Sequence, residues 1–390
     1  MSQSPPSRKR LRMELEESVP PVEKREPEES QRLSLSNLDP ATGRACDLPT
    51  LVKDHEFWFD DGTVLIVSRG VEFRVYKGLL ADHSVVFKEL FSQPHSHHTL
   101  SISDEQTIRC PLVHVTESPQ ELRHLLRVYM PRKGRSFWDV PGPTYEEISA
   151  SIRMGHKYDL KELYEQSLAF LKRHYTTDLR VWAESDYYTP PGWKEIYSIG
   201  VVNLARLVGE TSILPTALLA CTVMNAEIVR GFTYEDGSQE TLSPDDLGLC
   251  FQAKSRVRQA SIGAVVRTFR RSVAPGCKQA AACKSALRTA LHGLEAFIDK
   301  LVLDDPFFPF EEFVKDRKLG VCEFCMRLVR QRNWNERVAV WNSLPGLFGL
   351  DVPGWGNPLG QPPPGTQVPA PPPPQPPQHP PPPPVCFTSW

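Results

Sequence analysis

The chain has 390 residues, a formal net charge of −2 and nine cysteines. Its near-neutral charge excludes the strong positive field with which proteins attract nucleic acid or anionic membranes. No run of about eighteen apolar residues occurs, so we expect no transmembrane helix. Residues 1–17 lack the apolar core of a secretory signal. We therefore expect a soluble intracellular protein, nuclear or cytoplasmic, whose cysteines are reduced or bind metal.

The first 50 residues are rich in Ser, Pro, Glu and Arg and show no periodic apolar pattern. This composition predicts a disordered tail. Within it, Arg8, Lys9, Arg10 and Arg12 form a short basic cluster of the kind that nuclear import receptors bind. The alternative is a solvated run of charges, because several glutamates follow the cluster directly.

A hairpin with one buried face is predicted next. Asp60-Asp61-Gly62 forms a turn signal before the strand 63–67, and Ser68-Arg69-Gly70 leads into the alternating strand 71–76. The apolar spacing of residues 79–91 predicts two short amphipathic helices. Residues 92–109 are predicted to be a polar loop whose histidines are solvated rather than metal-bound, and Leu112 to Val115 a further strand.

Two helices that start with capping boxes are predicted after this strand. Ser118 is followed by Pro119 and then by Glu121, three residues after the serine. Thr144 and Glu147 repeat the spacing. The apolar positions that follow each box continue a helical layer to about residue 171.

These segments resemble a BTB/POZ domain over residues 53–175. The resemblance rests on FWFDDGTVLIV (57–67), FRVYKGLLADHSVVFKELF (73–91), CPLVHVTESPQELRHLLRVYM (110–130) and SIRMGHKYDLKELYEQSLAFLKRHY (151–175). It is closest to the fungal version, in which GHKYD ends one helix and starts the next. The resemblance implies an α+β protein-interaction fold, commonly a homodimer that buries the region 79–91, with no known catalysis. Tyr76 is a departure, because many members have histidine there.

Residues 176–350 are predicted to form an all-α domain. Apolar periodicity indicates helices over about 193–208, 213–230, 243–271, 278–300 and 309–343. Residues 351–390 are predicted to be a proline-rich disordered tail, because fifteen of the 24 positions from 361 to 384 are proline. Polyproline II is the conformation open to such a tail, either as a spacer or as a ligand for a proline-binding domain.

Four cysteines form two closely spaced pairs, Cys277 with Cys283 and Cys322 with Cys325. Four thiolates can bind one zinc ion tetrahedrally, and the 38 residues between the pairs are enough for a helix and its return. Buried structural thiols are the first alternative, because cysteine behaves as a small apolar residue. A redox CxxC pair is the second. Fungal proteins that resemble this chain often carry a similar pattern, followed by Trp and an ending like residues 341–350.

No motif of a known enzyme class occurs: there is no GxSxG, phosphate loop, GxGxxG after a strand, or HExxH. Acidic pairs such as Asp245-Asp246 suit helix caps and turns better than acid–base catalysis. We therefore expect a non-catalytic interaction scaffold with protein partners, no direct nucleic-acid contact and no membrane contact. The resemblance leaves two further hypotheses open: a substrate adaptor that binds a cullin through the helix 118–130, and a nuclear transcription co-regulator.

Overall fold

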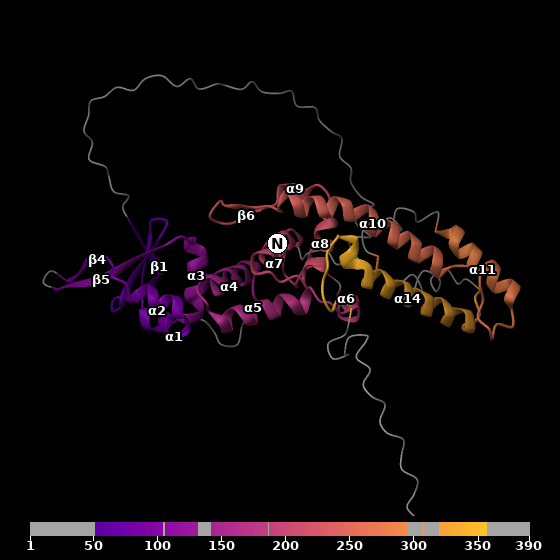
Figure 1. The fold of residues 1–390 in the computed structure, drawn as a ribbon, viewed down its shortest axis with the longest axis horizontal. Helices are drawn as coiled ribbons and strands as arrows, with labels where there is room; N and C mark the ends of the chain where they lie inside the picture. The colour runs from indigo at the N-terminus through magenta and orange to yellow at the C-terminus, as the bar shows by residue number, and fades with distance from the viewer. Residues whose placement is uncertain are drawn as a thin grey trace, which may run out of the picture.

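A computed structural model describes residues 51–103, 106–131, 142–185, 187–294, 306–307 and 320–356. The predicted N-terminal tail with its basic cluster, and the proline-rich run, lie outside the described residues. Residues 351–356 of the predicted C-terminal tail pack on the helical region instead, because Val352 is buried and the indole N–H of Trp355 donates to the carbonyl of Trp341 at 2.6 Å. The described part is elongated: a sheet lies at one end, helices lie in the middle, and a helical arm extends to the other end (Figure 1).

Five strands form the main sheet in the order β1-β3-β2-β5-β4. They are β1 (Val52–Trp58), β2 (Val64–Ser68), β3 (Val71–Val75), β4 (His97–Ser103) and β5 (Gln106–Val115). The predicted hairpin is confirmed: β2 and β3 pair antiparallel, with Val64 opposite Val75 and Ser68 opposite Val71. Its turn places Arg69 and Gly70 at φ 43° and 85°, and glycine accepts such angles without a steric penalty.

The predicted polar loop over residues 92–109 is wrong. Residues 97–103 form β4, which pairs antiparallel with β5 from Pro111 to Gln106. An edge strand satisfies its backbone on one side only and tolerates polar side chains, so the polar composition did not exclude a strand. The first strand was also not predicted; β1 pairs parallel with β3.

The helices of the sheet-containing part follow the prediction. They are α1 (Lys77–His83), α2 (Val85–Ser92), α3 (Pro119–Tyr129), α4 (Tyr145–Lys157) and α5 (Lys161–His174). Both capping boxes are confirmed: the hydroxyls of Ser118 and Thr144 accept from the backbone N–H of Glu121 and Glu147. A buried core joins the sheet to these helices, with Phe57, Ile66, Phe73, Leu80, Phe87, Leu122, Leu126 and Met154 among its members.

The second region is helical, as predicted. Its elements are α6 (Leu179–Glu184), a 3₁₀ turn (Glu195–Tyr197), α7 (Ser198–Val208), α8 (Leu214–Thr222), α9 (Glu227–Arg230), β6 (Phe232–Thr233), β7 (Gln239–Glu240), α10 (Pro244–Thr268), α11 (Ala280–Gly293) and α14 (Glu323–Leu347). The short hairpin β6–β7 was not predicted. The predicted helix 213–230 is divided, and Asn225 takes a positive φ of 52° between its two parts. Residues 295–305 and 308–319 lie outside the described part, so the end of the predicted helix 278–300 and the first residues of the predicted helix 309–343 are not tested. Residues 320–322 are not helical, contrary to the prediction, because Cys322 has an extended backbone (φ −65°, ψ 161°) and is the N-cap of α14.

A second core lies in the helical region and includes residues of α4 and α5. Tyr145, Ile148, Ile152, Leu171 and Tyr175 belong to it, whereas Met154, Tyr158 and Leu160 belong to the first core. The predicted core positions Leu214, Leu218, Cys221 and Met224 are all buried in this second core. The two cores therefore share α4 and α5.

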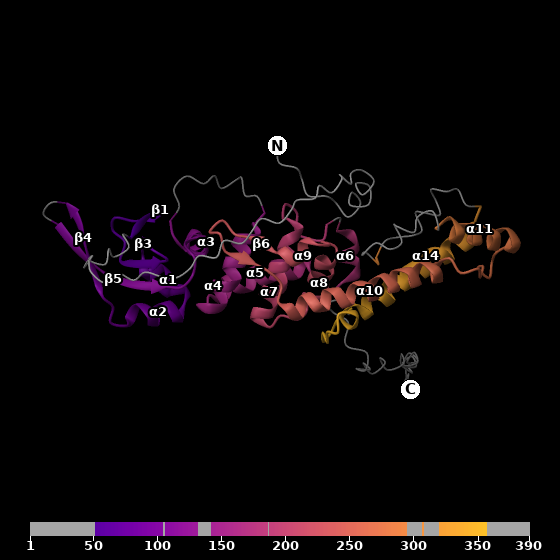
Figure 2. The same cartoon turned by 90° about the horizontal axis from the view of Figure 1, so that it is seen from above.

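The arm consists of α10 and α14 side by side, with α11 near its far end (Figures 1 and 2). At its inner end, Trp341 is buried against Trp182, and its indole N–H donates to the carbonyl of Thr177 at 3.0 Å. At its far end lies a small third core of Val265, Phe269, Leu287, Ala290, Leu294 and Val329. In the described part of the chain, no helix combines the length and apolarity needed to cross a bilayer.

Candidate functional site

The four cysteines lie together at the far end of the arm. Cys277 ends a turn that begins at Ala274, Cys283 lies in the first turn of α11, Cys322 is the N-cap of α14, and Cys325 lies in its first turn. Their sulfurs all lie within 4.8 Å of one another. The turn brings Gly276 against Phe324, and a Cβ on Gly276 would lie 2.9 Å from that ring.

The sulfur geometry suits a tetrahedral metal. The sulfurs of Cys277 and Cys322 are 3.7 Å apart. Four sulfurs at the zinc–sulfur bond length would lie about 3.8 Å from one another. Backbone N–H groups also point at two of the sulfurs: Ala274 donates to Cys325 at 3.4 Å, and Cys322 donates to Cys283 at 3.3 Å. Such N–H···S bonds stabilise thiolates and orient metal ligands.

The thiols differ in acidity. A hydrogen bond from the backbone of Cys325 is the main cause that lowers the pKa of Cys322 to about 7, against burial, which raises it. Burial is the main cause that raises the pKa of Cys325 to about 12. Cys322 therefore loses its proton more readily than Cys325. A bound cation would displace the remaining protons.

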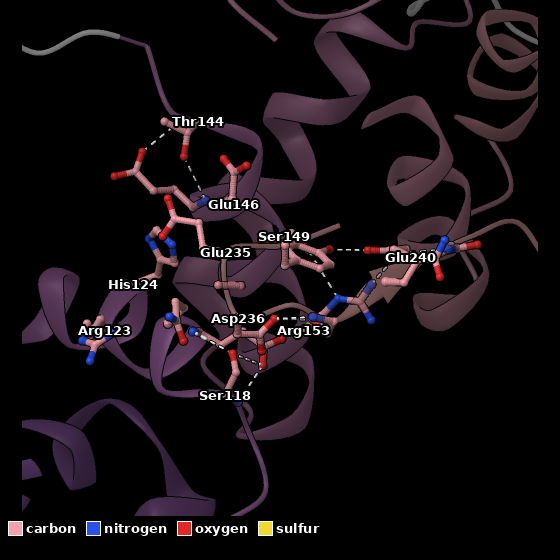
Figure 3. Close-up of a pocket in the computed structure, with 18 of the residues that line it drawn as sticks. Ser118, Arg123, His124, Thr144, Glu146, Ser149, Arg153, Glu235, Asp236 and Glu240 are labelled. Carbon is pink, nitrogen blue, oxygen red and sulfur yellow. Dashed lines mark hydrogen bonds and ion pairs between the residues drawn. The ribbon is translucent and has the colours of Figure 1, made fainter. Parts of the chain in front are cut away.

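A second feature is a polar cavity of about 780 Å³ between α3, α4 and the β6–β7 hairpin (Figure 3). Glu240 of β7 is 8% exposed. It accepts hydrogen bonds from Arg153 of α4 at 2.8 Å, from Asn203 of α7 at 2.9 Å and from Tyr145 at 3.3 Å. Tyr234 donates to the same carboxylate. The hairpin is thus fixed to a helix shared by both cores.

Several other ionisable groups of this cavity have structural partners. Arg69 of the β2–β3 turn pairs with Asp236 at the hairpin tip at 3.0 Å. Glu121 and Glu147 complete capping boxes. Burial, followed by the charge of Arg127, lowers the pKa of His124. Two lining hydroxyls donate to carboxylates: Ser118 to Glu121 at 3.0 Å and Ser238 to Asp236 at 2.5 Å. The first bond belongs to the capping box of α3 and the second to the turn of the β6–β7 hairpin.

A third feature is the outer face of α1 and α2. Leu79, Val85 and Val86 are 39%, 60% and 37% exposed, while Leu80 and Phe87 on the inner side are fully buried. Ser84 joins the two helices, accepts from the Phe87 N–H and donates to the carbonyl of Tyr158 at 2.5 Å. The outer face therefore exposes Leu79, Val85 and Val86 beside charged residues such as Lys88 and Glu89, and Ser84 joins it to the end of α4.

Residues 53–175 match the family model of the BTB/POZ domain. This stretch contains the sheet, α1 to α5 and the exposed α1–α2 face. The chain carries a BTB/POZ domain. A search of curated proteins finds no match.

The BTB/POZ family is a family of protein-interaction domains, and the predicted interaction fold is confirmed for residues 53–175. The α1–α2 face belongs to this BTB/POZ domain, while the cysteine cluster lies outside it. The hydroxyl of Tyr76 donates to Asp61 at 2.5 Å. The histidines of the predicted loop form no cluster: the His95 ring contacts the carbonyl of Leu90, and His98 lies 3.4 Å from Glu72.

Sequence reasoning missed the hairpin that anchors the helical region to the BTB/POZ domain. The signal was present, because Asp236-Gly237 is a turn dipeptide of tight hairpins. Gly237 has a φ of 80°. Of the predicted acidic pairs, Asp246 lies in the first turn of α10 and receives hydrogen bonds from Ser243 and Arg206, which is a structural role.

Proposed function

We propose that this chain is a non-catalytic interaction scaffold that forms a homodimer through the α1–α2 face of its BTB/POZ domain. The observation that carries the proposal is the exposure of Leu79, Val85 and Val86 on neighbouring helices that Ser84 joins to the end of α4. Pairing two copies would remove this apolar area from water. A dimer would also raise the effective concentration of any partner-binding segment on the rest of the chain.

We further propose that the chain is of the fungal type, in which a helical region follows the BTB/POZ domain.

Light scattering on the full-length chain tests the dimer. We expect a dimer mass for the parent chain and a monomer mass after Leu79→Glu with Val85→Glu, because buried unpaired carboxylates oppose association. Val128→Glu is the matched control, since Val128 is 50% exposed and belongs to α3, which is not part of the proposed interface. A monomeric parent chain, or a dimer that both variants leave intact, would refute this interface.

A second candidate is a substrate adaptor for a cullin-type ubiquitin ligase. The observation that favours it is Val128, an apolar side chain half-exposed on α3, the helix through which the BTB/POZ resemblance places cullin contact. Purified cullin N-terminal domain should bind the full-length chain. Val128→Glu should abolish this binding and leave the mass of the chain by light scattering unchanged. Loss of binding in the Leu79→Glu/Val85→Glu variant alone would contradict this assignment of faces.

A third candidate, a nuclear transcription co-regulator, depends on Arg8, Lys9, Arg10 and Arg12, which lie outside the described residues. Deleting residues 1–13 should move the protein from the nucleus to the cytoplasm. An unchanged distribution would remove this candidate.

We also propose a structural zinc site at Cys277, Cys283, Cys322 and Cys325. The sulfur separations, the two N–H···S bonds and the helix N-termini that carry three of the four sulfurs support it, because helix N-termini favour negative charge. The third core beside the cluster has few buried residues, so metal binding would supply stability that this small core lacks.

Elemental analysis of the full-length chain tests the zinc site. We expect about one zinc per chain and almost none after Cys325→Ser, together with a lower unfolding temperature. Cys250→Ser is the control, because Cys250 is a buried thiol in the second core, away from the cluster. A metal-free parent chain, or equal metal content in the two variants, would return the four thiols to the role of buried core residues.

A further inference from the structure

Arg332 of α14 is a buried cation beside the cysteine cluster. Its side chain is only 9% exposed. It follows Cys325 by seven residues, so the two positions lie on the same face of α14. Long side chains on a helix point back toward its N-terminus, which in α14 is the end that carries Cys322 and Cys325.

The guanidinium of Arg332 is bonded only to neutral groups among the described residues. It donates to the carbonyl of Arg270 at 3.1 Å, to the carbonyl of Ser272 at 2.9 Å and to the Ser272 hydroxyl at 2.5 Å. Its buried Nε has no hydrogen-bond partner there. No carboxylate of the described part lies within ion-pair distance of it. A buried charge without an opposite charge is costly, so this arginine requires another source of negative charge.

Within the described part of the chain, the cysteine cluster can supply this negative charge. Burial and Arg270 lower the pKa of Arg332, and Cys325 raises it. Four thiolates around a divalent cation carry a net charge of −2. The segment that Arg332 holds, residues 270–272, leads directly to Ala274, which donates to Cys325, and to Cys277. Arg332 thus lies on the same face of α14 as Cys325 and fixes the segment that leads to Cys277.

We propose that Arg332 is the counter-cation of the four-thiolate site, a positioning residue that stabilises the metal-bound thiolates by its charge. This inference rests on the proposed zinc site. It assigns to the arginine an electrostatic role in metal binding, distinct from a role in folding the arm. The loss of the charge should weaken zinc binding 10- to 100-fold, the range found for groups just outside a metal's ligands.

The experiment measures zinc affinity of the full-length chain by competition with a chromophoric chelator, and records the cobalt(II) spectrum, whose sulfur-to-metal bands report the thiolate ligands. Arg332→Met removes the charge and should lower zinc affinity 10- to 100-fold while the cobalt bands stay tetrahedral. Arg332→Lys keeps the charge and should retain most of the affinity. Arg330→Met is the matched control, because Arg330 is exposed on the same helix, and it should leave affinity unchanged.

The outcomes separate the two proposals. A parent chain that binds no zinc refutes the zinc site and this inference with it. A parent chain that binds zinc, with equal affinities for Arg332→Met and Arg330→Met, refutes the role of Arg332 alone. Equal losses in Arg332→Met and Arg332→Lys would show that the arginine only holds the loop. If Arg332→Met does not fold, zinc affinity is measured in Ser272→Ala and Arg332→Lys, which both keep the positive charge. Retained zinc affinity in these variants supports the inference, and a large loss of zinc affinity overturns it.

Discussion

Gly200 shows how a single residue fixes the junction between the BTB/POZ domain and the helical region. It is buried in α7, and a Cβ there would lie 1.7 Å from the hydroxyl oxygen of Tyr145. Gly200→Ala should therefore displace Tyr145 and destabilise the protein by about 1–3 kcal/mol, the usual cost of overpacking. Urea unfolding measures the change.

Gly248 provides the control for that substitution. It also lies inside a helix, α10, but a Cβ there would meet nothing within 4 Å. Gly248→Ala should stabilise the protein by about 0.5–1 kcal/mol, because alanine loses less backbone entropy on folding. Equal effects of the two alanines would contradict the close approach of Tyr145.

Glu117 links the end of β5 to the end of α4 and makes stability depend on pH. Burial acts to raise its pKa, but hydrogen bonds, first from Lys157 and also from Tyr158, outweigh it and hold the pKa below the ordinary value. A carboxyl whose folded pKa is lowered stabilises the fold above its unfolded pKa of about 4.3. This stability is lost as the pH falls through the folded pKa.

Glu117→Gln should therefore lower the free energy of unfolding at pH 7 by about 1 kcal/mol. As the pH falls from 5 to 3, this variant should lose less stability than the parent chain. The measurement is urea unfolding at each pH. Glu89→Gln, at an exposed position of α2, should change neither quantity. A parallel pH dependence in the parent chain and Glu117→Gln would show that this carboxyl does not carry the effect.

At the scale of elements, Glu240 attaches the β6–β7 hairpin to α4 and α7. This carboxylate is buried and accepts from two charged or amide donors and two tyrosines. Glu240→Gln removes its charge and brings a donor amide toward Arg153, so it should cost about 1–3 kcal/mol in urea unfolding. Glu235→Gln, on the exposed part of the same hairpin, should leave the stability unchanged. An equal loss of stability in both variants would mean that the hydrogen bonds of Glu240 contribute little.

Helices and strands were predicted correctly where the local sequence of a single segment determines its structure. The two capping boxes and the hairpin around Arg69 and Gly70 were predicted because local hydrogen bonds and turn angles determine them. The strands β1 and β4 were missed because their identity depends on pairing with distant partners and their side chains are partly polar. For the cysteines, spacing alone left zinc, buried thiols and redox chemistry open. The 3.7 Å sulfur separation and the position of Arg332 arise from tertiary packing, which no local pattern encodes.

At the scale of the whole molecule, the BTB/POZ domain and the helical region are physically continuous. Four residues of α4 and α5, together with the C-cap residue of α5, are buried in the second core: Tyr145, Ile148, Ile152, Leu171 and Tyr175. A fragment that ends at residue 175 keeps these helices but loses the residues that cover them. Each such side chain contributes about 1.5–3 kcal/mol when it is buried, so the loss is large relative to the stability of a typical domain.

The fragment 53–175 should therefore unfold at lower urea than the fragment 51–356 and self-associate through this uncovered surface. Binding of a hydrophobic dye and light scattering on both fragments measure the effect. If the proposed dimer interface is correct, Leu79→Glu with Val85→Glu will make 51–356 monomeric but will not abolish association of 53–175, because the second surface is independent of α1–α2. A monodisperse fragment 53–175 with the stability of 51–356 would show that the BTB/POZ domain is self-sufficient and that the shared helices do not couple the two regions.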